Sequence, residues 1–145
     1  MTPVQADLAR CFARTVYRVH LPERDLDLRI GCCHPLLDAF LHTLGASRWI
    51  VLSPCTPRAR LLDDASNAAR MAALRQAPAD EGSRHFSAVG LPTAEDHWPP
   101  EPSLLILDLA PEQAAQLAEH FGQWAWVSGE AGQPAELAWS SVPRV

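Results

Sequence analysis

Two continuous apolar runs constrain the fold of this chain more than any other feature of its sequence. The first is WIVL at 49–52, and the second is the LLIL run inside 103–109. A strand with one wet face alternates apolar and polar residues, whereas a strand covered on both faces reads as an unbroken apolar run. We therefore expect both runs to be central strands of one sheet with helices packed on it.

The rest of the chain alternates between helical and strand periodicity. Proline or an acidic residue stands at most of the expected helix starts, and Gly45 and Gly122 stand at two expected helix ends. A turn signal, Pro22-Glu23-Arg24-Asp25, predicts a hairpin between two short strands. We expect helices over 4–14, 34–44, 63–76 and 111–121, further strands over 15–21, 26–31, 85–90, 124–128 and 135–139, a loop over 78–84 and irregular chain over 91–102.

The order of these elements predicts a single α/β (α+β) domain spanning 1–145, with its core at about 12–139. The strand at 26–31, the helix at 34–44 and the strand at 49–53 have the spacing of a βαβ unit, in which the two strands run parallel. We expect a mixed sheet of about six strands. For the helix at 63–76 we expect a narrow face of small residues to lie on the sheet, with Asn67, Arg70 and Leu74 facing elsewhere; the small face is Leu62, Ala65, Ala69 and Ala72.

If the two strands are parallel neighbours, the residues that follow them meet at one sheet edge. Cys32, Cys33 and His34 would then lie near Cys55. A thiol-dependent enzyme using Cys33 or Cys55 with His34 is one hypothesis, because a helix N-terminus lowers a thiol pKa. The four cysteines have no paired zinc-ligand spacing, so we expect no metal site, and buried, inert thiols are the alternative.

A second candidate site is an anion clamp made by Arg58, Arg60, Asn67 and Arg70. Guanidinium groups offer planar forks of donors suited to carboxylates and phosphates. The alternative makes Arg70 a structural arginine that bridges its helix to an acidic loop. Glu101 belongs to an acid-rich stretch that could reach Arg70, so we include it among the candidate ligand-binding residues.

Charge and aromatic content argue against a nucleic-acid partner. Residues 1–84 hold 11 Arg and 9 acidic residues, while 85–143 hold no Arg and 8 acidic residues. A nucleic-acid binder carries a basic stripe, yet Trp124 and Trp126 fall in the acidic half and are better interpreted as core. Neither a signal peptide nor an apolar stretch of bilayer length is present, so we expect a cytoplasmic protein without a membrane or nucleic-acid partner.

Common catalytic and cofactor motifs are missing. The sequence contains no GxGxxG, GxxxxGK[ST], HExxH, EF-hand loop or GxSxG. We therefore assign no catalytic residues and no cofactor. We expect a non-catalytic binding or accessory domain for a small anionic metabolite beside Arg58 and Arg70. The alternatives are the thiol-dependent enzyme and a structural or protein-interaction module.

The order of several short segments resembles that of a bacterial family, domain-of-unknown-function family 3293. The resemblance covers about 12–139 and implies no known activity. It directs attention to Asn67, Arg70 and Glu101. The segments that carry it are the strand around Tyr17, Ile30-Gly31 before a Pro-initiated helix, Gly45-Ala46, Trp49, the Pro57 loop, Asn67-x-x-Arg70, Trp98 with Glu101, Phe121-Gly122-Gln123 and Glu136-Leu137.

Overall fold

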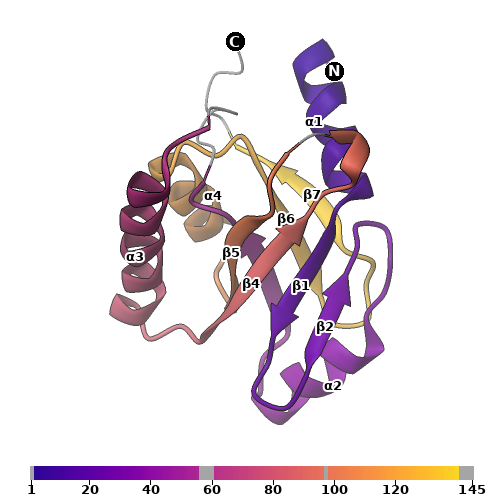
Figure 1. The fold of residues 1–145 in the computed structure, drawn as a ribbon. Coiled ribbons are helices and arrows are strands. Elements are labelled where there is room, and N and C mark those ends of the chain that lie inside the picture. Colours follow the sequence, from indigo (N-terminus) through magenta and orange to yellow (C-terminus); the bar gives the residue numbers. More distant parts are fainter. Residues whose placement is uncertain (1, 56–60, 97, 141–145) are drawn as a thin grey trace.

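The computed structural model describes residues 2–55, 61–96 and 98–140 (Figure 1). Four α-helices and seven strands occur there in an order that matches the expected one. No helix in these ranges combines the length and the apolar character needed to cross a membrane. The elements are α1 (Pro3–Arg14), β1 (Val16–His20), β2 (Asp25–Leu28), α2 (Pro35–Thr43), β3 (Arg48–Leu52), α3 (Asp64–Asp80), β4 (His85–Leu91), η2 (Ala94–Asp96), β5 (Glu101–Leu107), α4 (Pro111–His120), β6 (Ala125–Glu130) and β7 (Glu136–Trp139).

All seven strands form one sheet in the order β2-β1-β4-β5-β3-β6-β7, and each neighbouring pair is antiparallel. The two unbroken apolar runs, β3 and β5, lie next to each other near its centre, with Ile50 opposite Ile106. Their central position confirms the expectation drawn from the apolar runs. The α+β class and the single sheet are also confirmed, with seven strands where about six were expected.

The predicted βαβ unit is wrong. Three strands, β1, β4 and β5, separate β2 from β3 in the sheet. Because β2 is the second arm of a hairpin, pairing with β1 carries it to the sheet edge, and β5 occupies the place beside β3. Spacing along the chain gave the strand–helix–strand order correctly but carried no information about which strands pair. The parallel pairing in the described chain is a single isolated bridge, Ile30 to Ala135.

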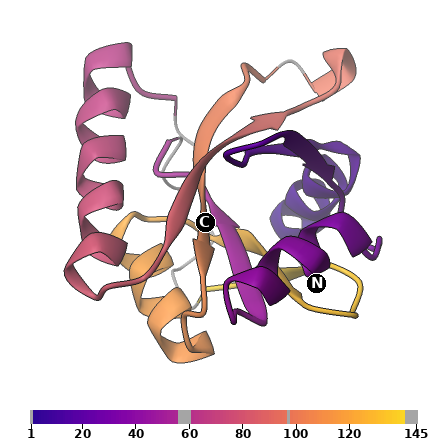
Figure 2. The ribbon, with the colours of Figure 1, turned by 90° about the horizontal axis from the view of Figure 1, so that it is seen from below.

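That bridge brings the two edges of the sheet together. Gly31 N donates to Ala135 O at 2.8 Å, and Ala135 N donates to Cys32 O at 3.0 Å. The chain leaving β2 is thereby tied to the chain entering β7, and the sheet curls around its inner face (Figure 2). The fold consequently has a concave face that is nearly enclosed.

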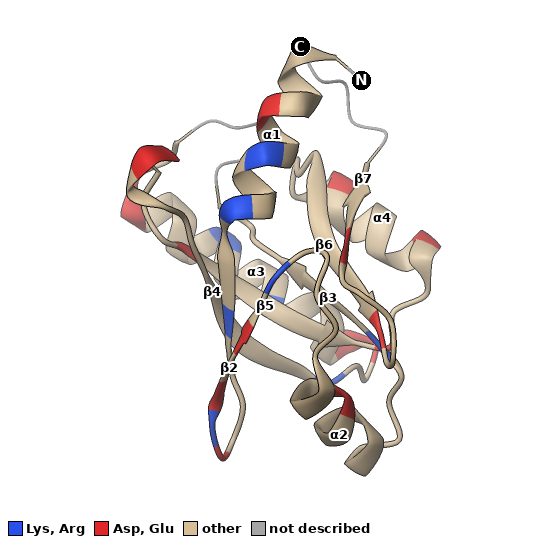
Figure 3. Cartoon of the chain, turned by 90° about the vertical axis from the view of Figure 1, so that its right-hand side faces the viewer, with Lys and Arg blue, Asp and Glu red and all other residues tan. Residues whose placement is uncertain are grey.

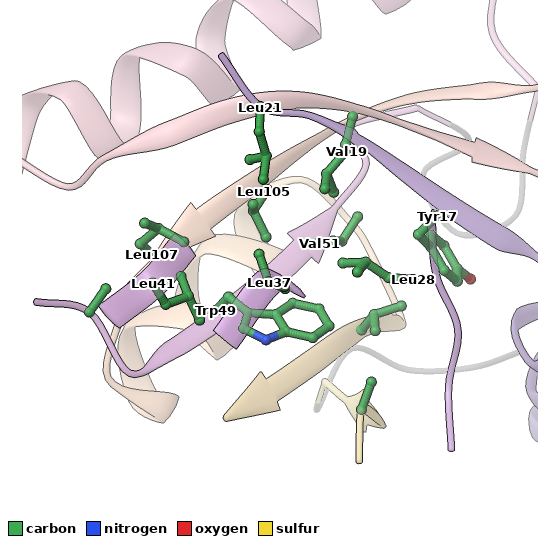
Figure 4. Packing of buried hydrophobic residues seen from close by; sticks show 14 residues of the cluster. Tyr17, Val19, Leu21, Leu28, Leu37, Leu41, Trp49, Val51, Leu105 and Leu107 are labelled. Atoms are coloured by element: carbon green, nitrogen blue, oxygen red, sulfur yellow. The ribbon is translucent and has the colours of Figure 1, made fainter. Parts of the chain in front are cut away.

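Large apolar side chains fill the concave face. Trp49 and Val51 of β3 lie among leucines from the neighbouring strands, and Leu37 and Leu41 of α2 point into the same cluster (Figure 4). Both α2 leucines are fully buried, so this short helix covers one end of the curl. At roughly 25 cal/mol per Å² of apolar surface, this burial is the main stabilising contribution to folding.

Helices α3 and α4 cover the convex face (Figures 1 and 2). The orientation expected for α3 is wrong, because Leu74 is fully buried against β5 and β3 residues while Ala65, Ala69 and Ala72 are exposed. Burying Leu74 and Met71 removes far more apolar surface from water than burying alanines. The face that contacts the sheet is therefore the one that carries Arg70.

Helix α3 also extends beyond its expected end at Gln76. It continues through Pro78 to Asp80, and Gly82, with φ of +71°, follows the end. Ser83 N donates to Pro78 O at 2.8 Å, which satisfies one of the last helical carbonyls. A proline in a final turn removes one helical hydrogen bond, and Pro78 is buried at this end of the helix.

Gly129 of β6 lies opposite Trp49. Replacing this glycine tests the packing of the concave face. A Cβ at this position would lie 2.2 Å from the Trp49 ring carbons Cε2 and Cζ2. We expect Gly129→Ala to lower the free energy of unfolding by about 1 to 3 kcal/mol, measured by urea denaturation, because the indole cannot move without disturbing the core. Gly90→Ala is the matched control, since its Cβ would meet ordinary contacts at 3.7 Å. Equal stability of the two variants would contradict this packing.

Candidate functional site

A partly enclosed cavity of about 120 Å³ lies at the end of the curl opposite α2. Five strands contribute to it, because β1, β5 and β6 begin at this end and β3 and β4 finish there. Ligand sites commonly occupy the mouth of a β-barrel for the same geometric reason. The described lining residues are Leu8, Cys11, Phe12, Thr15, Tyr17, Val51, Ser53, Gly90, Pro92, Trp98, Pro99, Glu101, Ser103, Gln123, Trp124, Ala125 and Trp126.

Helix α1 and the chain between β4 and β5 form the roof of the cavity (Figure 1). The Asp96 carboxylate, with 2% of its side chain exposed, pairs with Arg14 and accepts a hydrogen bond from Thr93 Oγ1 at 3.1 Å. Burial would raise the pKa of Asp96, but the hydrogen bonds from Thr93 and Arg14 outweigh it and lower the pKa. Asp96 thereby joins α1 to the chain between β4 and β5. Figure 3 shows the arginine residues of α1 in blue.

Hydroxyl groups on the cavity wall donate their protons to the backbone. Thr15 Oγ1 donates to Cys11 O at 2.6 Å, Ser53 Oγ to Pro102 O at 2.9 Å, and Ser103 Oγ to Glu101 O at 3.0 Å. Tyr17 follows the same pattern, since its hydroxyl donates to Phe12 O at 3.4 Å. Each of these four hydroxyls thus has a backbone acceptor within the protein.

Glu101 is the one acidic residue among the described lining residues. Its charge reaches two neighbouring groups. Burial raises the pKa of Tyr17, and the Glu101 carboxylate raises it further. Burial likewise raises the pKa of the Cys55 thiol, Glu101 adds to this effect, and Arg70 opposes it. Two predicted ligand-binding residues, Arg70 and Glu101, therefore both act on Cys55.

Arg70 does not line the cavity. Its Nε donates to Pro54 O at 2.6 Å, Nη2 donates to Phe121 O, and the guanidinium lies 5.4 Å from the centroid of the Phe121 ring. Phe121 is the C-cap of α4, where a positive charge is favourable because the last helical carbonyls are unsatisfied. Arg70 thus joins α3 to the exit of β3 and the end of α4. The structural alternative placed it against an acidic loop, but its partners are carbonyl groups.

Of the other residues of the predicted anion clamp, Asn67 alone lies within the described ranges. Asn67 Nδ2 donates to Leu62 O at 3.4 Å, and its buried Oδ1 accepts no hydrogen bond from the described residues. Arg58 and Arg60 lie outside the described residues. Binding of an anion by these side chains stays a prediction.

The expected gathering of three thiols with His34 is wrong. It depended on β2 and β3 being parallel neighbours, and they are not. The His34 ring lies edge-on to Trp49 near the start of β3, with ring centroids 6.2 Å apart, whereas Cys55 follows the end of that strand. Cys32 and Cys33 are exposed, and Cys55 is buried. Across the described ranges, no three His, Cys, Asp or Glu residues are placed to hold a metal ion.

Reasoning from the sequence missed most of the cavity. Of its lining residues only Glu101 was singled out as a ligand-binding candidate. The available signal was aromatic: Phe12, Tyr17, Trp98, Trp124 and Trp126 are half of the ten aromatic residues of the chain. Trp124 and Trp126 were correctly expected to be buried, with exposures of 7% and 5%. Only the strand order shows that all five aromatic residues meet at one end.

This geometry defines a class: a small α+β domain with a curled antiparallel sheet and an aromatic cavity at one end. A family model described as "Protein of unknown function (DUF3293)" matches residues 52–126, which are 75 of the 145 residues. The chain therefore belongs to this family, as the order of its segments indicated. No curated protein and no solved structure matches the chain.

Replacement of Arg70 tests whether this side chain supports the fold. We expect Arg70→Ala to lower the free energy of unfolding by about 2 to 3 kcal/mol, because the Pro54 and Phe121 carbonyls lose a charged donor. Arg75→Ala is the matched control on the same helix, where the guanidinium donates to Ser87 Oγ at 3.0 Å in an exposed position. Its expected effect in chemical denaturation is within about 0.5 kcal/mol. Equal effects of the two replacements would argue against a structural Arg70.

Proposed function

We propose that this protein is a non-catalytic binding domain that holds a small organic molecule in the cavity beneath α1. The single observation that supports it is the cavity, which joins five aromatic side chains to one carboxylate and a few hydroxyl groups. Ligand pockets are mostly apolar with a small number of placed polar groups. A cavity of about 150 Å³ with apolar walls holds a benzene ring, and this one, at about 120 Å³, is somewhat smaller and only partly enclosed, so the space suits a compound no larger than a single ring.

The state of the thiols supports binding over thiol-dependent catalysis. Cys11 and Cys55 both have a raised pKa, caused first by burial, which keeps them protonated at neutral pH. The thiolate is the nucleophilic form, so neither group is activated. Cys33 and His34 lie by α2, away from the cavity. The thiol-dependent enzyme therefore has less support than the binding domain.

The anionic ligand predicted at Arg58 and Arg70 also has less support than a ligand in the cavity. Two of the five N–H donors of Arg70 already bind backbone carbonyls, so an anion would meet a side chain that the fold already uses. Cytoplasmic location stays a prediction from the sequence.

Titration with toluene followed by backbone amide NMR tests the proposed cavity. We expect saturable shifts confined to the amides of Gly90, Ser103 and Ala125 and their neighbours. Gly90→Ala should weaken toluene binding by about tenfold, since one added methyl group fills part of a small pocket. The free variant should fold normally, because its Cβ meets only ordinary contacts.

Ala138→Gly serves as a control that changes one methyl group on β7, outside the cavity lining. It should leave the affinity for toluene unchanged. The proposal fails if toluene shifts no lining amide at millimolar concentration, or if it binds Gly90→Ala as tightly as the original protein.

A further inference from the structure

We propose that the ligand of this cavity is an uncharged ring compound with one hydrogen-bond acceptor, and that this acceptor binds the indole N–H of Trp124. The inference rests on the proposed function and names the chemical class of the ligand. The observation behind it is a buried donor that has no partner, on a side chain that lines the cavity.

Trp124 stands just before β6, with 7% of its surface exposed. Its indole Nε1 is buried and has no hydrogen-bond partner among the described residues. Its backbone, in contrast, is held in place, since Ser140 N donates to Trp124 O at 2.9 Å. Buried tryptophan N–H groups usually find a partner, because an unsatisfied buried donor costs about 1 to 3 kcal/mol. A group from outside the chain is therefore the partner that this donor lacks.

The indole N–H restricts the ligand more than the hydroxyl groups of the wall do. A hydroxyl can turn its proton toward a backbone carbonyl or toward a ligand, and it can also accept a hydrogen bond. An indole N–H has a fixed direction in the plane of its ring and can only donate. Thr15, Ser53 and Ser103 thus accommodate donors and acceptors alike, whereas Trp124 requires an acceptor.

The side-chain amide beside Trp124 in the sequence already has its acceptors. Gln123 Nε2 donates to Cys55 O at 2.8 Å and to Phe121 O at 3.4 Å, and a side-chain amide has two N–H donors. Both donors of Gln123 are used within the fold. Trp124 therefore remains as the fixed donor of this pair, and a single acceptor on the ligand satisfies it.

The described part of the lining favours an acceptor without charge. It contains no Lys, Arg or His, so an anion would meet no positive charge on this part of the wall. A carboxylate or phosphate would lose its hydration there without an opposite charge, which is very unfavourable. A ring nitrogen or an ether or carbonyl oxygen loses much less on leaving water and gains the hydrogen bond from Trp124. The aromatic side chains then enclose the apolar part of the ligand.

Benzene and pyridine test the inference, because they have the same shape and differ by one acceptor nitrogen. Both are titrated at mildly alkaline pH, where pyridine is uncharged, and NMR follows the lining amides and the Trp124 indole N–H signal, assigned with Trp124→Phe. We expect both ligands to shift the lining amides. Only pyridine should move the indole proton downfield, as a new hydrogen bond does. This measurement uses the original protein and does not depend on the folding of a variant.

Trp124→Phe should reduce the pyridine-to-benzene affinity ratio by about tenfold, because phenylalanine keeps a ring but lacks the N–H donor. Trp139→Phe, on β7 and outside the described lining, is the matched control and should leave the ratio unchanged. Taking the ratio within one variant cancels any change in stability or cavity size.

The inference is overturned if pyridine binds among the lining amides without moving the Trp124 indole proton downfield, or if Trp124→Phe leaves the affinity ratio unchanged. In either case the proposed function stands, since a ligand still occupies the cavity. If neither benzene nor pyridine shifts the lining amides, the proposed function itself fails.

Discussion

The antiparallel pairing of β3 with β5 is the constraint on which the rest of the structure depends. Both strands are apolar on both faces, so they stay out of water only between two covered layers. One layer consists of α3 and α4, and the other is the sheet itself, curled around Trp49 and Val51. Because neighbouring strands alternate in direction, five strand ends meet at one end of the curl, and the cavity lies there.

Trp49 and Gly129 show how closely the curl is packed. The indole occupies the space that a side chain on β6 would need, and the His34 ring lies edge-on to it. Trp49 and the leucines of α2 fill one end of the concave face. At the opposite end small or polar residues such as Gly90 and Ser103 stand on the strands among the aromatic side chains, and space remains between them. The difference between the two ends explains why the cavity forms beneath α1.

The local elements of the fold could be predicted from the sequence, and the pairing could not. Periodicity located the helices and strands because each depends on residues close in sequence. The partner of β3 depends instead on β5, about 50 residues further along the chain, and no local pattern specifies it. The prediction of which face of α3 contacts the sheet was wrong. The small residues suggested close packing against the sheet, whereas burial of Leu74 contributes more to stability.

The candidate site likewise depends on contacts between residues far apart in the sequence, which local patterns do not specify. Arg70 was noticed because a charged side chain is conspicuous in a sequence, yet the fold uses it to bind carbonyls at the end of α4. Glu101 was noticed for its position in an acidic stretch and proves to line the cavity. Thr15 and Gln123 were not predicted as site residues, because their importance comes from the backbone groups that their donors reach.

A crystal structure of the protein soaked with toluene would test the central claim most directly, because it shows where the ligand lies and which atoms it contacts. The account predicts density for the ring among Phe12, Trp98 and Trp124. An empty cavity, or density for the ligand only against α2 or Arg70, would contradict it.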